Sequence, residues 1–239
     1  MTAPPPMPEP PRPPKDDHEG SLPPLLFVLT VVTGLVDAVS YLKLGHVFVA
    51  NMTGNVVFLG FAVAGAKDFS VSASLVAIAA FLLGALAGGR LGSSMAEHRT
   101  RFFAIAIVVK LALVAAAWFL ILAVGNVDLV QYGLIVLLAL AMGLQNATAR
   151  VLAVADLTTT VLTLTLTGLA ADSTLAGGTS PRRNRRLLAT SAMFLGAAVG
   201  AFLVLHVGAG AVLCLTFTLL ALIAVAAYRI WSRSAGQAA

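Results

Sequence analysis

The sequence is poor in charge: acidic and basic residues together make up 10% of its 239 residues, whereas 59% are hydrophobic. A soluble domain carries roughly 25% charged residues, so the composition excludes a water-exposed globular fold for most of the chain. The single cysteine, Cys214, excludes an internal disulfide. The sequence also lacks a paired His and Cys set, a phosphate-binding loop and a Ser–His–Asp set with interpretable spacing. We therefore expect no enzyme, no metal site and no cofactor.

What the sequence does contain is a series of eight apolar stretches, each close to the roughly 20 residues that a helix needs to cross a bilayer. They are rich in Leu, Ala and Val and lack the alternation of membrane β-strands. Backbone groups in lipid must be hydrogen-bonded internally, so an all-α integral membrane protein is the predicted fold class. The stretches lie at 22–41, 46–65, 70–89, 103–124, 129–149, 155–171, 187–207 and 210–231.

The ends of the chain differ from the apolar part. Residues 1–21 hold eight prolines before residue 15, and they lack the basic and apolar regions of a signal peptide. This composition predicts a disordered cytoplasmic tail. The transmembrane domain is expected at 22–231, followed by a short tail at 232–239. The net charge of +5 fits arginine-rich membrane loops, so we expect a lipid bilayer and no nucleic acid as partner.

Three blocks of the first half recur in the same order in the second half. Residues 34–38 match 143–147, residues 50–56 match 155–161, and residues 83–88 match 195–200, at offsets of 109, 105 and 112. A fixed order of matches indicates an internal duplication. Repeat A is expected at about 22–124 and repeat B at about 129–231.

Arginine placement predicts the topology. Arginines lie around the loop after the third stretch and in the loop after the sixth, and positive loops favour the cytoplasm. Both loops are cytoplasmic, together with both termini, if the chain makes about six net crossings. Each half then crosses three times, which inverts the second half, and the second and sixth stretches are interrupted or re-entrant helices, as in many transporters. Eight plain crossings are the alternative, and they place the two loops on opposite sides.

Most intramembrane polar residues fall in the repeated blocks. Where repeat A has Asp37 and Asn51, repeat B has Asn146 and Asp156. A carboxylate in the membrane usually faces a partner, water or the bundle interior, so the two aspartates are candidates for handling a proton or cation, with amides and hydroxyls supplying hydrogen bonds. The predicted substrate- or ion-binding residues are Asp37, Asn51, Thr53, Asn55, Asn146, Asp156, Thr158, Thr159 and Thr160.

A purely structural role for these charges is the competing interpretation. Asp37 then pairs with Lys110 or Arg150, and Asp156 pairs with the other. The sequence leaves both interpretations open. Gly84-x-x-x-Gly88 and the matching motif at 196–200 favour close helix contact, either within the chain or between two copies in a homodimer.

The blocks at 33–42, 50–55, 143–147 and 156–160 together resemble the YoaK family, a group of bacterial multi-pass membrane proteins defined as a domain of unknown function. The resemblance covers about residues 22–231. It implies a multi-pass protein of the bacterial cell membrane and supplies no substrate. The duplication and the matched polar residues favour a transporter or permease for a small solute or ion. A non-transporting assembly, sensor or accessory protein is the second hypothesis, and an enzyme acting on lipids is the third.

Overall fold

The structure is a computed structural model, and it describes residues 22–96, 98–152, 162–179 and 183–237. Within these ranges the chain forms helices joined by short turns and contains no strand. In chain order the elements are α1 (Leu22–Lys43), α2 (Met52–Val63), α3 (Val71–Ser94), α4 (Arg99–Val124), α5 (Val127–Leu152), α6 (Leu162–Ala171), η3 (Thr174–Ala176), α7 (Arg183–His206) and α8 (Ala209–Gln237).

Among the described residues, six helices are long and apolar enough to cross a membrane: α1, α3, α4, α5, α7 and α8. Helices α2 and α6 have 12 and 10 residues, so they extend about 18 Å and about 15 Å, well short of the ~30 Å hydrocarbon core. The all-α membrane fold with about six crossings is confirmed. Helix α8 continues to Gln237, so most of the expected tail at 232–239 belongs to this helix.

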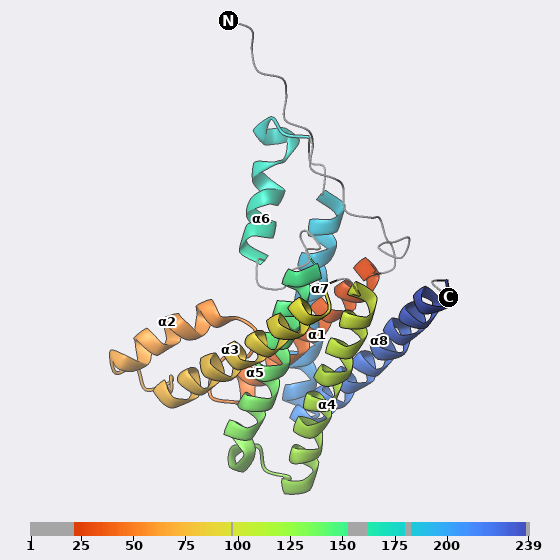
Figure 1. Ribbon diagram of the computed structural model, residues 1–239. Helices are drawn as coiled ribbons and strands as arrows, with labels where there is room; N and C mark the ends of the chain where they lie inside the picture. The colour runs from red at the N-terminus through yellow and green to blue at the C-terminus, as the bar shows by residue number, and fades with distance from the viewer. Residues whose placement is uncertain (1–21, 97, 153–161, 180–182, 238–239) are drawn as a thin grey trace, which may run out of the picture.

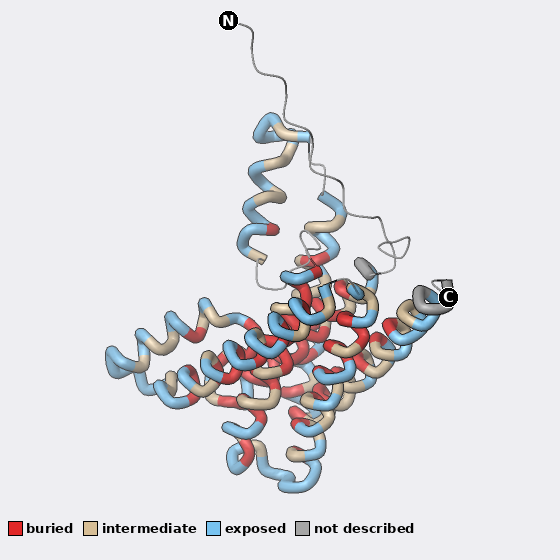
Figure 2. The backbone as a smooth tube through the Cα atoms, viewed as in Figure 1, coloured by how far each residue is buried: buried red, intermediate tan, exposed pale blue. Residues whose placement is uncertain are grey.

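The spanning helices pack in pairs that join the two halves of the chain (Figure 1). Helix α1 packs most closely on α7, α3 on α5, and α4 on α8, while α4 also contacts α5 and α8 contacts α1. Buried residues concentrate where these helices meet, whereas α2 and α6 are largely exposed at the edge of the bundle (Figure 2). The halves therefore form one intertwined core rather than two separate units.

Two helix crossings bring backbones into direct contact through glycine. A Cβ atom on Gly143 of α5 would lie 2.0 Å from the carbonyl oxygen of Phe81 on α3, and one on Gly84 would lie 2.2 Å from that of Leu140. Residues without a side chain let membrane helices approach closely and gain van der Waals contact. The motif at 84–88 thus serves contact within the chain, and a homodimer would need another surface.

The crossing of α1 with α7 uses glycines at the corresponding positions of the other half of the chain. A Cβ on Gly34 would lie 2.4 Å from the Met193 carbonyl oxygen, and one on Gly196 would lie 2.2 Å from that of Val31. Gly34 precedes Gly143 by 109 residues, and Gly84 precedes Gly196 by 112. These are the offsets of the sequence blocks, so matched residues of the two halves make equivalent contacts.

The α3–α5 crossing gives a matched pair of variants. We expect Gly84→Ala to destabilise the protein by about 1–3 kcal/mol, because its new Cβ is forced against backbone. Gly89→Ala lies on the same helix with nothing within 4 Å of its Cβ, and it is expected to be neutral or slightly stabilising. Membrane yield and thermal unfolding of the purified variants check this, and equal effects at both positions would contradict the close-contact argument.

Candidate functional site

The chain reverses direction immediately after α1. Gly45 and His46 have left-handed backbone conformations, with φ of +81° and +55°, and they turn the chain back toward the bundle. The Ala50 N–H then donates to Asp37 Oδ1 at 3.2 Å. Asp37 lies six residues before the end of α1, about 9 Å back along the helix. Residues 44–51 therefore run back along α1 without forming a helix, and α2 begins at the level of Asp37.

Helix α2 returns the chain to the end of the bundle where α1 finishes. Its aromatic residue Phe58 stacks on Phe48 and on Phe69, with ring centroids 5.7 Å and 4.9 Å apart. The ring of His46 contacts the backbone oxygen of Asp68 at 3.2 Å through Nδ1, which places the loop after α2 beside the turn after α1. Residues 44–68 thus form a re-entrant element, as expected for the second apolar stretch.

Two asparagines hold the re-entrant element together. Asn55 is fully buried, accepts a hydrogen bond from Phe48 N at 2.8 Å and donates to Phe48 O at 2.6 Å. Asn51 caps α2 by accepting from Gly54 N at 3.4 Å, a residue type favoured at this position. The amide of Asn55 therefore has its hydrogen bonds with the backbone of Phe48, so Asn55 fixes the shape of the re-entrant element.

A cavity of about 370 Å³ lies where α1, α2, α6 and α7 meet. Its polar lining residues include Asp37, Asn51 and Thr53, which the sequence analysis selected, together with Thr33 and Thr163. The second half of the chain contributes to the wall through α6 and α7, so the cavity lies between the halves. The lining residues are Thr33, Asp37, Ala50, Asn51, Thr53, Gly54, Val57, Phe58, Leu162, Thr163 and Met193.

The remaining predicted residues lie elsewhere or outside the described ranges. Asn146 is buried in α5, where its Nδ2 donates to the Met142 carbonyl at 3.0 Å, and it is not among the lining residues of the cavity. Four predicted residues fall within 153–161, which lies outside the described residues. They are Asp156, Thr158, Thr159 and Thr160.

The buried lysine has a neutral partner. Lys110 is 1% exposed, and its ammonium donates to Gln145 Oε1. Gln145 Nε2 in turn donates to Thr33 Oγ1 at 2.9 Å. In the described part of the chain, Asp37 forms no ion pair with Lys110 or with Arg150, which is exposed. The ion pair of Asp37 with Lys110 or Arg150 that the sequence offered is therefore absent. Gln145 is the partner of Lys110 that charge-based reasoning missed.

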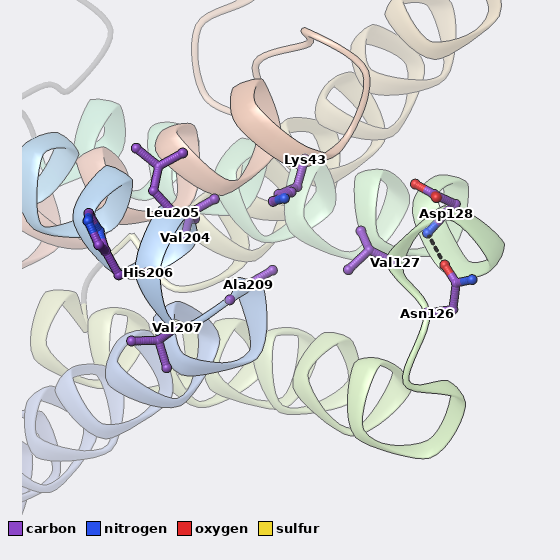
Figure 3. Close-up of a pocket in the computed structure, with 10 residues that line it drawn as sticks. Lys43, Asn126, Val127, Asp128, Val204, Leu205, His206, Val207 and Ala209 are labelled. Atoms are coloured by element: carbon purple, nitrogen blue, oxygen red, sulfur yellow. Dashed lines mark hydrogen bonds between the residues drawn. The ribbon is translucent and has the colours of Figure 1, made fainter.

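A second, shallower cavity of about 340 Å³ opens at the end of the bundle where α1 finishes and the α4–α5 and α7–α8 turns lie (Figure 3). Lys43, Asp128 and His206 line it, and Asn126 Oδ1 accepts from Asp128 N at 2.9 Å. These polar groups are exposed and surround apolar residues of the turns. Across the described ranges, no group of three His, Cys, Asp or Glu side chains is placed to hold a metal ion.

These features define a multi-pass α-helical membrane protein with a polar cavity beside a re-entrant element. The model of the family described as "Protein of unknown function (DUF1275)" matches residues 25–226, so the chain belongs to this family, and the predicted YoaK-family membership is confirmed. The chain is similar to the UPF0700 transmembrane protein YoaK of Bacillus subtilis (strain 168), with 35% identity over 150 residues. The match covers 62% of this chain and 65% of that protein's length. No solved structure matches the chain.

Proposed function

We propose that this protein is a transporter or channel-like permease of the bacterial cell membrane for a small solute or ion, without enzymatic activity. The observation that carries the proposal is the buried carboxylate of Asp37, which faces a polar cavity lined from both halves of the chain. A charge inside the membrane is costly, and such residues commonly mark substrate or ion pathways. A non-transporting accessory protein would need neither the cavity nor an aspartate that lacks a cationic partner among the described residues.

We further propose that the two halves are inverted repeats. Support comes from the equivalent contacts of α1 with α7 and of α5 with α3, made through glycines at constant offsets. Each half also contains three of the six long apolar helices. Three crossings place the second half upside down relative to the first. The re-entrant element at 44–68 and the one predicted for the sixth stretch would then enter from opposite faces, an arrangement that suits alternating access.

Flux into proteoliposomes tests the transport proposal. The full-length protein is purified, reconstituted and assayed with protons, sodium, potassium and small organic solutes of each charge. Flux above that of protein-free vesicles, saturable in one solute class, would support transport. No flux for any solute class, with protein correctly inserted, would overturn it and favour the accessory role.

The proposed topology predicts which loops a membrane-impermeant maleimide reaches in intact cells. In a Cys214→Ser background, we expect Asn126→Cys to react from outside, because it lies in an exposed turn opposite the arginine loops. Ala96→Cys and Asn184→Cys are exposed beside those loops and should react only after permeabilisation. These substitutions leave every arginine in place, so the charge bias that sets orientation is unchanged. Opposite sidedness of positions 96 and 184 would refute the inverted repeat.

A further inference from the structure

Among the described residues, the cavity at Asp37 is lined by one charged side chain. This is the carboxylate of Asp37 itself, and no described lysine, arginine or histidine lines the cavity. The carboxylate is 6% exposed and accepts a backbone N–H from Ala50, a neutral donor that does not cancel a negative charge. The buried Lys110 is not among the lining residues. Its ammonium donates to Gln145, and Gln145 in turn contacts the lining residue Thr33. The site is therefore suited to a positively charged occupant.

The size and walls of the cavity distinguish between kinds of cation. Its volume of about 370 Å³ is on the order of ten times the ~30 Å³ share of one liquid water, much larger than a dehydrated metal ion. Calcium-type ions need 6–8 oxygen ligands at roughly 2.3–2.6 Å, whereas the larger side chains that line this cavity are apolar: Val57, Phe58, Leu162 and Met193. A lining that combines polar and apolar side chains fits an organic molecule with a charged end.

We propose, on the basis of the transport function proposed above, that the cavity binds a small organic cation such as a protonated or quaternary amine. Asp37 accepts the cationic head, while Asn51, Thr53 and Thr163 supply hydrogen-bonding groups around it. The hydrocarbon part lies against Val57 and Phe58. The ring of Phe58 is held in place by stacking on Phe48 and Phe69, so it gives the hydrocarbon part a fixed apolar surface to pack against.

Binding to the purified full-length protein tests the substrate class. Isothermal titration is carried out with choline, with 3,3-dimethyl-1-butanol as its neutral isostere, and with propylammonium, butyrate and potassium. We expect saturable binding of an organic cation, at least tenfold tighter than binding of the neutral isostere, the anion or potassium. The affinity should fall at least tenfold in Asp37→Asn.

A second pair of variants keeps the proposal testable if Asp37→Asn folds poorly. Phe58→Leu removes an aromatic ring from the cavity wall and should weaken organic-cation binding severalfold. Phe194→Leu, an exposed phenylalanine on α7 outside the lining, should leave the affinity unchanged. Potassium or the neutral isostere binding as tightly as the amines, or equal effects of the two phenylalanine variants, would overturn the proposal.

The outcome separates the substrate class from transport itself. Binding of an amine without flux in proteoliposomes would retain the cation site and remove the transport function. Saturable flux of a neutral or anionic solute, with no binding of either amine, would retain transport and overturn the organic-cation site.

Discussion

Asp37→Asn is expected to yield a folded, membrane-inserted protein that has lost most of its transport activity. Asparagine keeps an oxygen that accepts from Ala50 N–H, which lies 3.2 Å from the carboxylate. The substitution breaks no ion pair with Lys110, whose ammonium donates to Gln145. The change in unfolding free energy should therefore stay within about 1 kcal/mol. Hydrogen bonds to a charged group contribute about 1.5–3 kcal/mol, so losing the charge should reduce flux about tenfold to a hundredfold.

Flux in proteoliposomes and thermal unfolding, measured on the same preparation, check this prediction. Asp68→Asn is the matched control, because Asp68 is exposed on the loop after α2 and contacts His46 only through its backbone oxygen. Asp37→Leu removes the acceptor as well as the charge, and it should also lower membrane yield by freeing the re-entrant chain. A large stability loss in Asp37→Asn would assign Asp37 a structural role, and wild-type flux would remove it from the transport mechanism.

The helices could be predicted from the sequence because each membrane span is a local property. A run of about 20 apolar residues predicts a crossing regardless of what the rest of the chain does. The second stretch, 46–65, needed more information: residues 44–51 are non-helical and only Met52–Val63 is helical. Charge bias and the repeat indicated an interrupted element there, but the left-handed turn at Gly45 and His46 has no equally clear sequence signal.

The candidate site was predicted in part, because polar residues inside a membrane stand out against an apolar background. Asp37, Asn51 and Thr53 line the cavity as selected. The role of Asn55 could not be derived, since its pairing with the Phe48 backbone depends on the chain reversal. Phe58 and Met193 were missed because an apolar residue facing a cavity and one facing lipid look the same in the sequence.

The partner of Lys110 shows why pairing buried charges in the sequence was insufficient to predict the hydrogen-bond partner of the lysine. The search for a buried countercharge selected Asp37, yet an amide satisfies the ammonium at lower desolvation cost than a second buried ion. Gln145 lies within the repeated block 143–147. The repeat therefore drew attention to its position, but the sequence did not indicate which group it would bind. Its side chain reaches Lys110 on α4 and Thr33 on α1, and the contact joins three helices behind the cavity.

This contact leads to the largest stability effect that we expect. Gln145→Leu should destabilise the protein by about 3 kcal/mol or more, because it leaves the Lys110 ammonium buried without its acceptor. Lys110→Met removes the charge while keeping a side chain of similar length, and its cost should be about 1–2 kcal/mol, from the unsatisfied Gln145 oxygen. The double variant, with neither buried group left unpaired, should be close to wild type in stability.

Thermal unfolding followed by the fluorescence of Trp118 and Trp231 measures all three variants. For a chain of this size, 1 kcal/mol corresponds to roughly 2–4 °C in Tm, so Gln145→Leu should lower Tm by roughly 10 °C and adding Lys110→Met should restore most of that loss. Lys43→Met, an exposed lysine on α1, controls for the loss of a positive charge. Because residues in contact give non-additive effects, a double variant whose loss equals the sum of the single losses would show that Gln145 does not satisfy the Lys110 ammonium.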